Sequence, residues 1–154
     1  MKLLIFLLTS SLLISSVMNC LVAISDCPCG NILDLAYARD GMIYTEHRGC
    51  IRNMTCPKAE STYVNSLMDS SEIPKPSDVT PYDDDQFTDP NSSNPTGVFV
   101  DIFSYFGMIC EDKTWFVTKY PTGATYHLPE YSKTIGSPEE YNGKKSMIDS
   151  YLCI

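Results

Sequence analysis

The chain has 154 residues, with 11 Lys and Arg against 19 Asp and Glu, and its formal net charge at pH 7 is −8. This surplus of negative charge opposes binding to nucleic acid and to anionic membrane surfaces, because both carry charge of the same sign. We therefore expect no nucleic-acid partner. The length suits one domain with its own hydrophobic core.

Residues 1–25 have the layout of a secretory signal peptide. Lys2 supplies the positive start, and the stretch from Leu3 to Ile24 is uncharged and dominated by apolar residues. The small residues Ala23 and Ser25 predict cleavage just before Asp26. An uncleaved anchor is the alternative, because a helix of this length, at about 1.5 Å per residue, crosses a bilayer. We predict a secreted protein that meets a membrane only if the leader is retained as an anchor.

Cleavage at this point changes the number of cysteines from odd to even. The chain has seven, and Cys20 lies in the leader. An even set in an oxidising compartment predicts three disulfides. The cysteines expected to form them are Cys27, Cys29, Cys50, Cys56, Cys110 and Cys153.

Geometry removes some of the 15 pairings that six cysteines allow. A Cys27–Cys29 bond would close a badly strained ring, and Cys50 and Cys56 lie roughly 20 Å apart if the segment is extended. About ten pairings stay open. A zinc site is the alternative, but such sites favour at least two residues between paired cysteines, and only Pro28 separates the first two. We expect no metal and no cofactor.

The segment from Gly49 to Cys56 alternates as a β-strand does. One face, predicted to point inward, holds Cys50, Arg52, Met54 and Cys56. The other face holds Ile51, Asn53 and Thr55. Asn53 begins one glycosylation sequon and Asn91 begins another, so we predict N-linked glycans at both.

The segment 58–97 is rich in Ser, Asp, Asn and Pro, which predicts an irregular insert with no more than a brief helical turn at Tyr63–Met68. Within it, the run Asp83–Asp85 suggests calcium as a possible ligand. The run lacks the glycine and closing glutamate of an EF-hand loop, so we expect a solvated acidic loop.

The last third, from Val98 onward, holds most of the aromatic and β-branched residues. Strands are expected over Val98–Ile109, Trp115–Tyr120 and Ala124–Leu128, with a helix as the alternative for the first. Ser137 is expected to cap a short helix that has acidic residues in its first turn. The fold class expected for residues 26–154 is mainly β, namely a single small, disulfide-stapled, antiparallel and sandwich-like domain with a long irregular acidic and Pro-rich loop.

Groups suited to catalysis are few. His47 and His127 are the only histidines, and the chain has no G-x-S-x-G, H-E-x-x-H, P-loop or dinucleotide-binding motif. We therefore predict a non-catalytic extracellular domain, structural or protein-binding, whose partner is an extracellular protein or matrix component. The alternative is a small secreted hydrolase that uses one of the two histidines as its base.

The spacing of the cysteines and their neighbours resembles that of nematode-specific secreted six-cysteine domains of unknown function. The matching features are Cys27-Pro28-Cys29, Gly49-Cys50, Cys56, Cys110 followed by Lys113-Thr114-Trp115, and the terminal Cys153. The likeness covers nearly all of residues 26–154, and the chain departs from it in the long acidic insert. It implies a secreted, disulfide-stabilised domain, carries over only the six cysteines, and leaves the function open.

Overall fold

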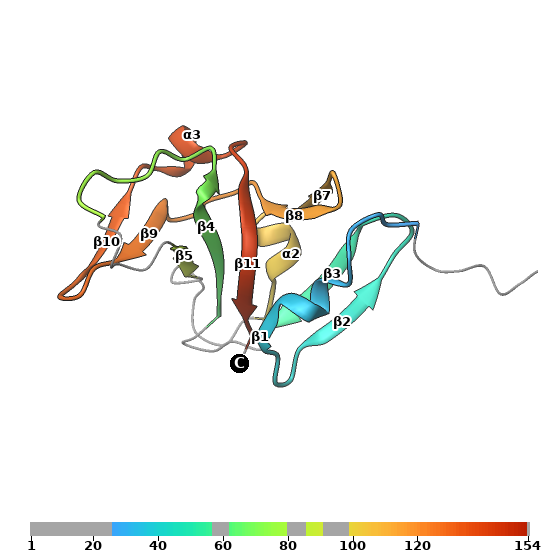
Figure 1. Cartoon of the computed structure of the whole chain (residues 1–154). Helices are drawn as coiled ribbons and strands as arrows, with labels where there is room; N and C mark the ends of the chain where they lie inside the picture. The colour runs from blue at the N-terminus through green and yellow to red at the C-terminus, as the bar shows by residue number, and fades with distance from the viewer. Residues whose placement is uncertain (1–25, 57–61, 80–85, 91–98, 154) are drawn as a thin grey trace, which may run out of the picture.

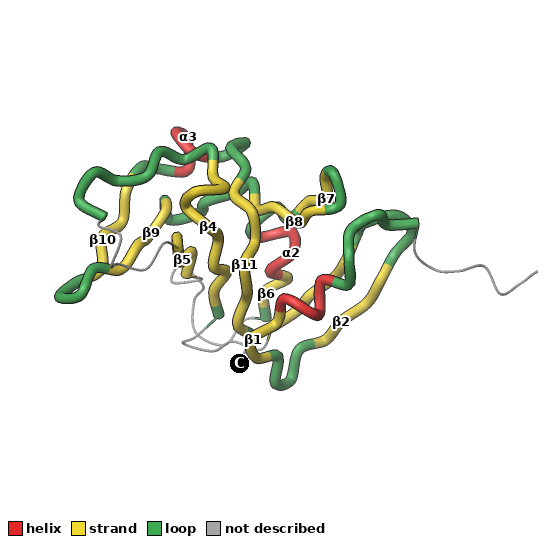
Figure 2. Tube along the Cα trace, in the orientation of Figure 1, coloured by secondary structure: helices red, strands yellow, loops and turns green. Residues whose placement is uncertain are grey.

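The computed structural model describes residues 26–56, 62–79, 86–90 and 99–153. The expected leader, the Asp83–Asp85 run and the sequon at Asn91 lie outside these residues. The described part is mainly β, as predicted, and its named strands pair antiparallel except for β1 and β11. Figure 2 shows that helix is confined to short segments between strands and loops.

The strands are β1 (Ala36–Ala38), β2 (Ile43–Glu46), β3 (Arg52–Cys56), β4 (Tyr63–Ser71), β5 (Gln86–Pro90), β6 (Val100–Asp101), β7 (Ile109–Glu111), β8 (Thr114–Val117), β9 (Ala124–His127), β10 (Ser132–Ile135) and β11 (Ser146–Leu152). The helical segments are the 3-10 helix η2 (Ile32–Leu35) and the single-turn helices α2 (Ile102–Tyr105) and α3 (Pro138–Tyr141).

The larger sheet is organised around β11. Its strand order is β10-β9-β5-β4-β11-β8-β7, and β1 pairs with β11 outside this path. One edge of β11 pairs with β4. On the other edge β8 pairs with the start of β11, at Ser146 and Met147, and β1 pairs with its end, at Tyr151 and Leu152. β11, near the C-terminus, thus pairs with a strand from the N-terminal part of the chain (β1) and with strands from its middle and later parts (β4 and β8).

The smaller sheet has the order β2-β3-β6. Figure 1 shows the β2–β3 hairpin to one side of β11, with α2 next to β3. Side chains from both sheets and from α2 form one buried cluster. Its fully buried members include Met54, Val64, Phe87, Ile102, Phe106, Val117, Tyr120, Tyr126 and Tyr151.

The six expected cysteines form three disulfides, Cys27–Cys50, Cys29–Cys110 and Cys56–Cys153. The two pairings that geometry excluded are absent from this set. The third bond has the largest sequence separation, 97 residues, and connects the end of β3 in the smaller sheet to the residue that follows β11 in the larger one. The Cys56–Cys153 disulfide therefore links the two sheets covalently.

The predicted alternation in the first third is confirmed. Arg52, Met54 and Cys56 are buried in β3, whereas Asn53 and Thr55 between them are half-exposed. The strand begins at Arg52, two residues after Cys50, because the β2–β3 hairpin turns through Arg48–Cys50. Its inward face carries one of the three disulfides.

The expectation for 58–97 is wrong in two places. Tyr63–Met68 is not a turn of helix but part of β4, a nine-residue strand at the centre of the larger sheet. Gln86–Pro90 is β5, which pairs with β4 and β9. Other described parts of the segment, including Pro74–Val79, are loops without strand or helix.

The described part of the segment 98–109, residues 99–109, combines both structures that its sequence allowed. A two-residue strand, β6, is followed at once by α2, and the next strand begins only at Ile109. Asp101 explains the switch, because its carboxylate accepts hydrogen bonds from the Ser104 N–H and hydroxyl and so caps the helix. The continuous strand expected here is therefore corrected. Ser137 stands at the N-cap position of α3, as predicted, with Pro138 and two acidic residues in the first turn, but its side chain makes no capping hydrogen bond.

Candidate functional site

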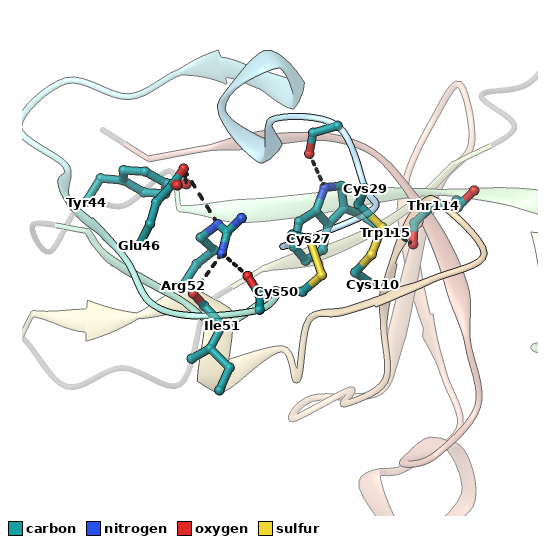
Figure 3. The surroundings of a disulfide bond; sticks show 12 residues. Cys27, Cys29, Tyr44, Glu46, Cys50, Ile51, Arg52, Cys110, Thr114 and Trp115 are labelled. Carbon is teal, nitrogen blue, oxygen red and sulfur yellow. Dashed lines mark hydrogen bonds and ion pairs between the residues drawn. A yellow bond between two sulfur atoms is a disulfide. The ribbon is translucent and has the colours of Figure 1, made fainter. Parts of the chain in front are cut away.

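Two of the disulfides lie side by side and anchor the N-terminal segment. Cys27 is bonded to Cys50 before β3, and Cys29 is bonded to Cys110 in β7. The sulfur atoms of Cys27, Cys50 and Cys110 lie within 4.8 Å of one another. Figure 3 shows the two bonds next to Trp115. Because all four sulfurs are in S–S bonds, they are not the thiolates that a zinc site requires.

Arg52 is the charged side chain buried beside this pair of disulfides. It is 5% exposed, and its Nη1 donates hydrogen bonds to the carbonyl oxygens of Gly49 (3.0 Å) and Ile51 (2.9 Å). Its Nε lies 3.8 Å from the Glu46 carboxylate, and its guanidinium carbon lies 5.8 Å from the centre of the Trp115 ring. The guanidinium thus stabilises the hairpin turn, faces a counter-charge and contacts an aromatic face (Figure 3).

Trp115 lies between the Arg52 guanidinium and other core residues, and it contacts both. Its Nε1 donates a hydrogen bond of 2.9 Å to the carbonyl oxygen of Gly30, and its ring meets Phe103 edge to face at 6.0 Å. The side chain is 4% exposed. Trp115 and Tyr120 are therefore core residues, whereas Phe116, which follows Trp115 in β8, is half-exposed.

A shallow open pocket of about 270 Å³ lies next to the disulfide pair. It is lined by Gly30, Asn31, Asp34, Leu35, Lys113, Thr114, Trp115, Met147 and Ile148. Lys113 stands in the two-residue turn between β7 and β8, where both it and Asp112 have positive φ, at 65° and 49°. The pocket is smaller than the usual range for drug-sized ligands, about 300 to 1,000 Å³. Its lining includes one acidic and one basic side chain but neither histidine.

The two histidines lie apart from this pocket. His47 is exposed in the turn that follows β2. His127 ends β9, is exposed, and has its Nδ1 2.7 Å from the Ser132 hydroxyl of β10. The hairpin of β9 and β10 forms one end of the larger sheet, whereas β7 and β8, which help to line the pocket, form the other. Neither of the two predicted candidate bases lines this pocket.

A second polar cluster fixes the loop that follows β4. Asp78 accepts hydrogen bonds of 2.8 Å from the Tyr126 hydroxyl and from the Lys133 ammonium. The Lys133 hydrogen bond, with that of Tyr126, holds the pKa of Asp78 below its usual value. The cluster has a structural explanation, because it ties a loop to β9 and β10.

Asn53 lies on the outer face of β3 and is half-exposed. Its Oδ1 accepts a hydrogen bond of 2.6 Å from the Thr55 hydroxyl, so the two polar residues of the sequon are in contact. A glycan attached here would extend away from the core. The predicted glycosylation at Asn53 and Asn91 stays a prediction.

The feature that sequence reasoning missed is the contact between Arg52 and Trp115. Strand alternation correctly placed Arg52 on the inward face beside the cysteines. It did not identify the aromatic partner, because Trp115 is more than 60 residues away in a different sheet. A buried arginine on a cysteine-bearing face was the available signal, since such a charge needs a partner.

Tyr44 gives this region a measurable pH dependence. Burial, together with the hydrogen bond that its hydroxyl donates to Glu46 (2.7 Å), raises the pKa of Tyr44 to about 12, and burial raises the pKa of Tyr151 to about 12. An unfolded tyrosine titrates near pH 10. The folded state therefore retains protons that the unfolded state loses, and the stability these groups contribute, complete below about pH 10, should fall between pH 10 and 12.

Following phenolate absorbance during alkaline titration of folded and denatured protein tests this prediction. We expect some tyrosines of the folded protein to titrate late, and Tyr44→Phe to remove one of them. If every tyrosine of the folded protein titrates near pH 10, the burial argument is wrong.

Within the described residues, no helix has the length and apolar character needed to cross a membrane.

Comparison with known proteins gives one assignment. The family model described as TRA-1 regulated protein R03H10.4 matches residues 25–153, and this family is named after a C. elegans protein. No curated protein and no solved structure matches the chain significantly. The match supports the nematode part of the resemblance. The chain belongs to the TRA-1 regulated protein R03H10.4 family.

Proposed function

We propose that this protein is secreted after removal of residues 1–25 and acts outside the cell by binding an extracellular protein or matrix component, without catalysis. The three disulfides carry the proposal. They involve every cysteine that remains after the proposed cleavage and fix the N-terminal segment, the smaller sheet and the C-terminus. Disulfides of this number persist in oxidising compartments and are rare in the cytosol.

The described site supports binding over catalysis. Its charged residue, Arg52, is held by carbonyl oxygens and by Trp115 inside the core, where a substrate does not reach it. The neighbouring pocket is shallow, its Asp34 and Lys113 come from different elements, and its lining includes neither histidine. The family name states how one member is regulated and names no reaction.

One contact favours a hydrolase as the second candidate. His127 and Ser132 are within hydrogen-bond distance, as a base and its nucleophile must be. Both are exposed on a hairpin, whereas acyl transfer also needs a pocket with donors for the developing oxyanion. His127→Ala and Ser132→Ala should each leave the secreted protein folded, and loss of an esterase or peptidase activity in both would support this second candidate over the first.

Secretion of the full chain from a eukaryotic host tests the leading proposal. The protein in the medium should begin at Asp26, and after removal of any glycans its intact mass should be lower than that of the fully reduced chain by six hydrogens. Ala23→Lys is the matched control, because a bulky charged residue at the third position before the cut should block cleavage. A chain that stays in the cell with six free thiols would overturn the proposal.

A further inference from the structure

The outer face of the smaller sheet combines apolar exposure with the sequon at Asn53. Because Arg52, Met54 and Cys56 point into the core, the alternating residues of β3 point outward. In β2, Ile43 pairs with Thr55 and Thr45 pairs with Asn53, so these residues lie on the same outer face. β2 is also an edge strand of its sheet.

This face is unusually apolar for a surface. Ile43 is 58% exposed and Ile51 is 61% exposed, and Phe99, just before β6, is 59% exposed. Ile43, Ile51 and Phe99 are three of the five large apolar side chains found strongly exposed among the described residues. An exposed apolar edge strand is a site at which chains associate unless it is covered.

Asn53 stands between the two isoleucines. It is the diagonal neighbour of Ile43 across the β2–β3 ladder, at about 7 to 8 Å between Cα atoms. Ile51 lies two residues before it on the same face, about 7 Å away along the strand. The Thr55 hydroxyl, which bonds to the Asn53 side-chain oxygen, holds the amide toward the Ile43 end of this face.

We propose that an N-linked glycan on Asn53 packs over Ile43 and Ile51 and covers this apolar face. The proposal rests on the proposed secretion, which supplies the compartment where such glycans are added. The sugar rings and acetyl methyl groups of the glycan core have apolar faces that fit the two isoleucines, and their hydroxyls remain in water. A tethered glycan also blocks approach of a second chain to the β2 edge.

The experiment compares the secreted full chain with Asn53→Gln, with Asn91→Gln as the matched control, and with wild-type protein trimmed enzymatically to the first sugar after folding. Trimming removes all of the glycan except its first sugar and, because it follows folding, has no effect on folding. The readouts are glycopeptide mass, binding of an apolar fluorescent dye, and self-association measured by sedimentation. Loss of the Asn53 glycan should strengthen self-association on the order of tenfold, whereas Asn91→Gln should not.

A second pair of substitutions assigns the effect to the face. Adding Ile43→Thr and Ile51→Thr to the Asn53→Gln chain keeps β-branched residues in both strands and should return dye binding and self-association to wild-type levels. The inference is overturned if Asn53 is glycosylated and its loss changes neither readout, if the glycosylated protein already dimerises through this face, or if the secreted protein has no glycan there. In each of these results the protein is still secreted, whereas a chain retained in the cell with its leader overturns the proposed function instead.

Discussion

Replacing both Cys56 and Cys153 by alanine should lower the free energy of unfolding by about 4 to 5 kcal/mol, because the bond they form closes a very long loop in the unfolded chain. The two cysteines are separated by 97 residues and are fully buried, and they connect the smaller sheet to the strand that organises the larger one. Guanidinium chloride unfolding, followed by circular dichroism, measures the change.

The matched control is the double replacement of Cys27 and Cys50. These residues are separated by 23 positions and are half-exposed, so removing their bond should cost about 1 kcal/mol less than removing Cys56–Cys153. The comparison is fair because each variant leaves four cysteines that can form the two remaining bonds. An equal or larger loss in the control would show that constraint of the unfolded chain does not determine the ranking.

The part of the fold that the sequence predicted best is β3. Its side chains alternate without a break, and alternation is a local property that needs no knowledge of the partner strand. The cysteines at Cys50 and Cys56 strengthened the inference, because sulfurs that form disulfides are expected to point inward. The inward position of Arg52 followed from the same pattern, although its partner did not.

β4 escaped prediction because its apolar residues have the wrong spacing. Val64, Leu67 and Met68 are three and four residues apart, as on one face of a helix, while the inward position between them is occupied by Ser66. The strand forms because β5 and β11 pair with its two edges, and β11 lies near the far end of the chain. Such non-local pairing overrides local preference and leaves no trace in the segment itself.

The short helix α2 could have been predicted from the sequence, whereas the disulfide pairing could not. Asp101 is a good N-cap with a serine three residues later, a signal that the apolar alternation around it concealed. The pairing of the six cysteines depends on which strands are neighbours in space, and about ten combinations satisfied the sequence equally well. For the same reason the apolar face around Asn53 became visible only once β2 and β3 were paired.

Replacing Arg52 by alanine should lower the free energy of unfolding by about 3 kcal/mol, because it removes two charge-assisted hydrogen bonds and leaves a cavity beside Trp115. Arg52→Lys keeps the charge but not the planar group that donates to Gly49 and Ile51 while facing the indole, so a loss of about 1 to 2 kcal/mol is expected. Arg48→Ala, in the exposed turn nearby, is the control and should change stability by less than about 0.5 kcal/mol. Chemical denaturation with the disulfides intact ranks the three variants. If Arg52→Lys were as stable as the parent chain, the positive charge alone would explain the burial of Arg52, and the fit of its guanidinium to the turn and to Trp115 would have no energetic role.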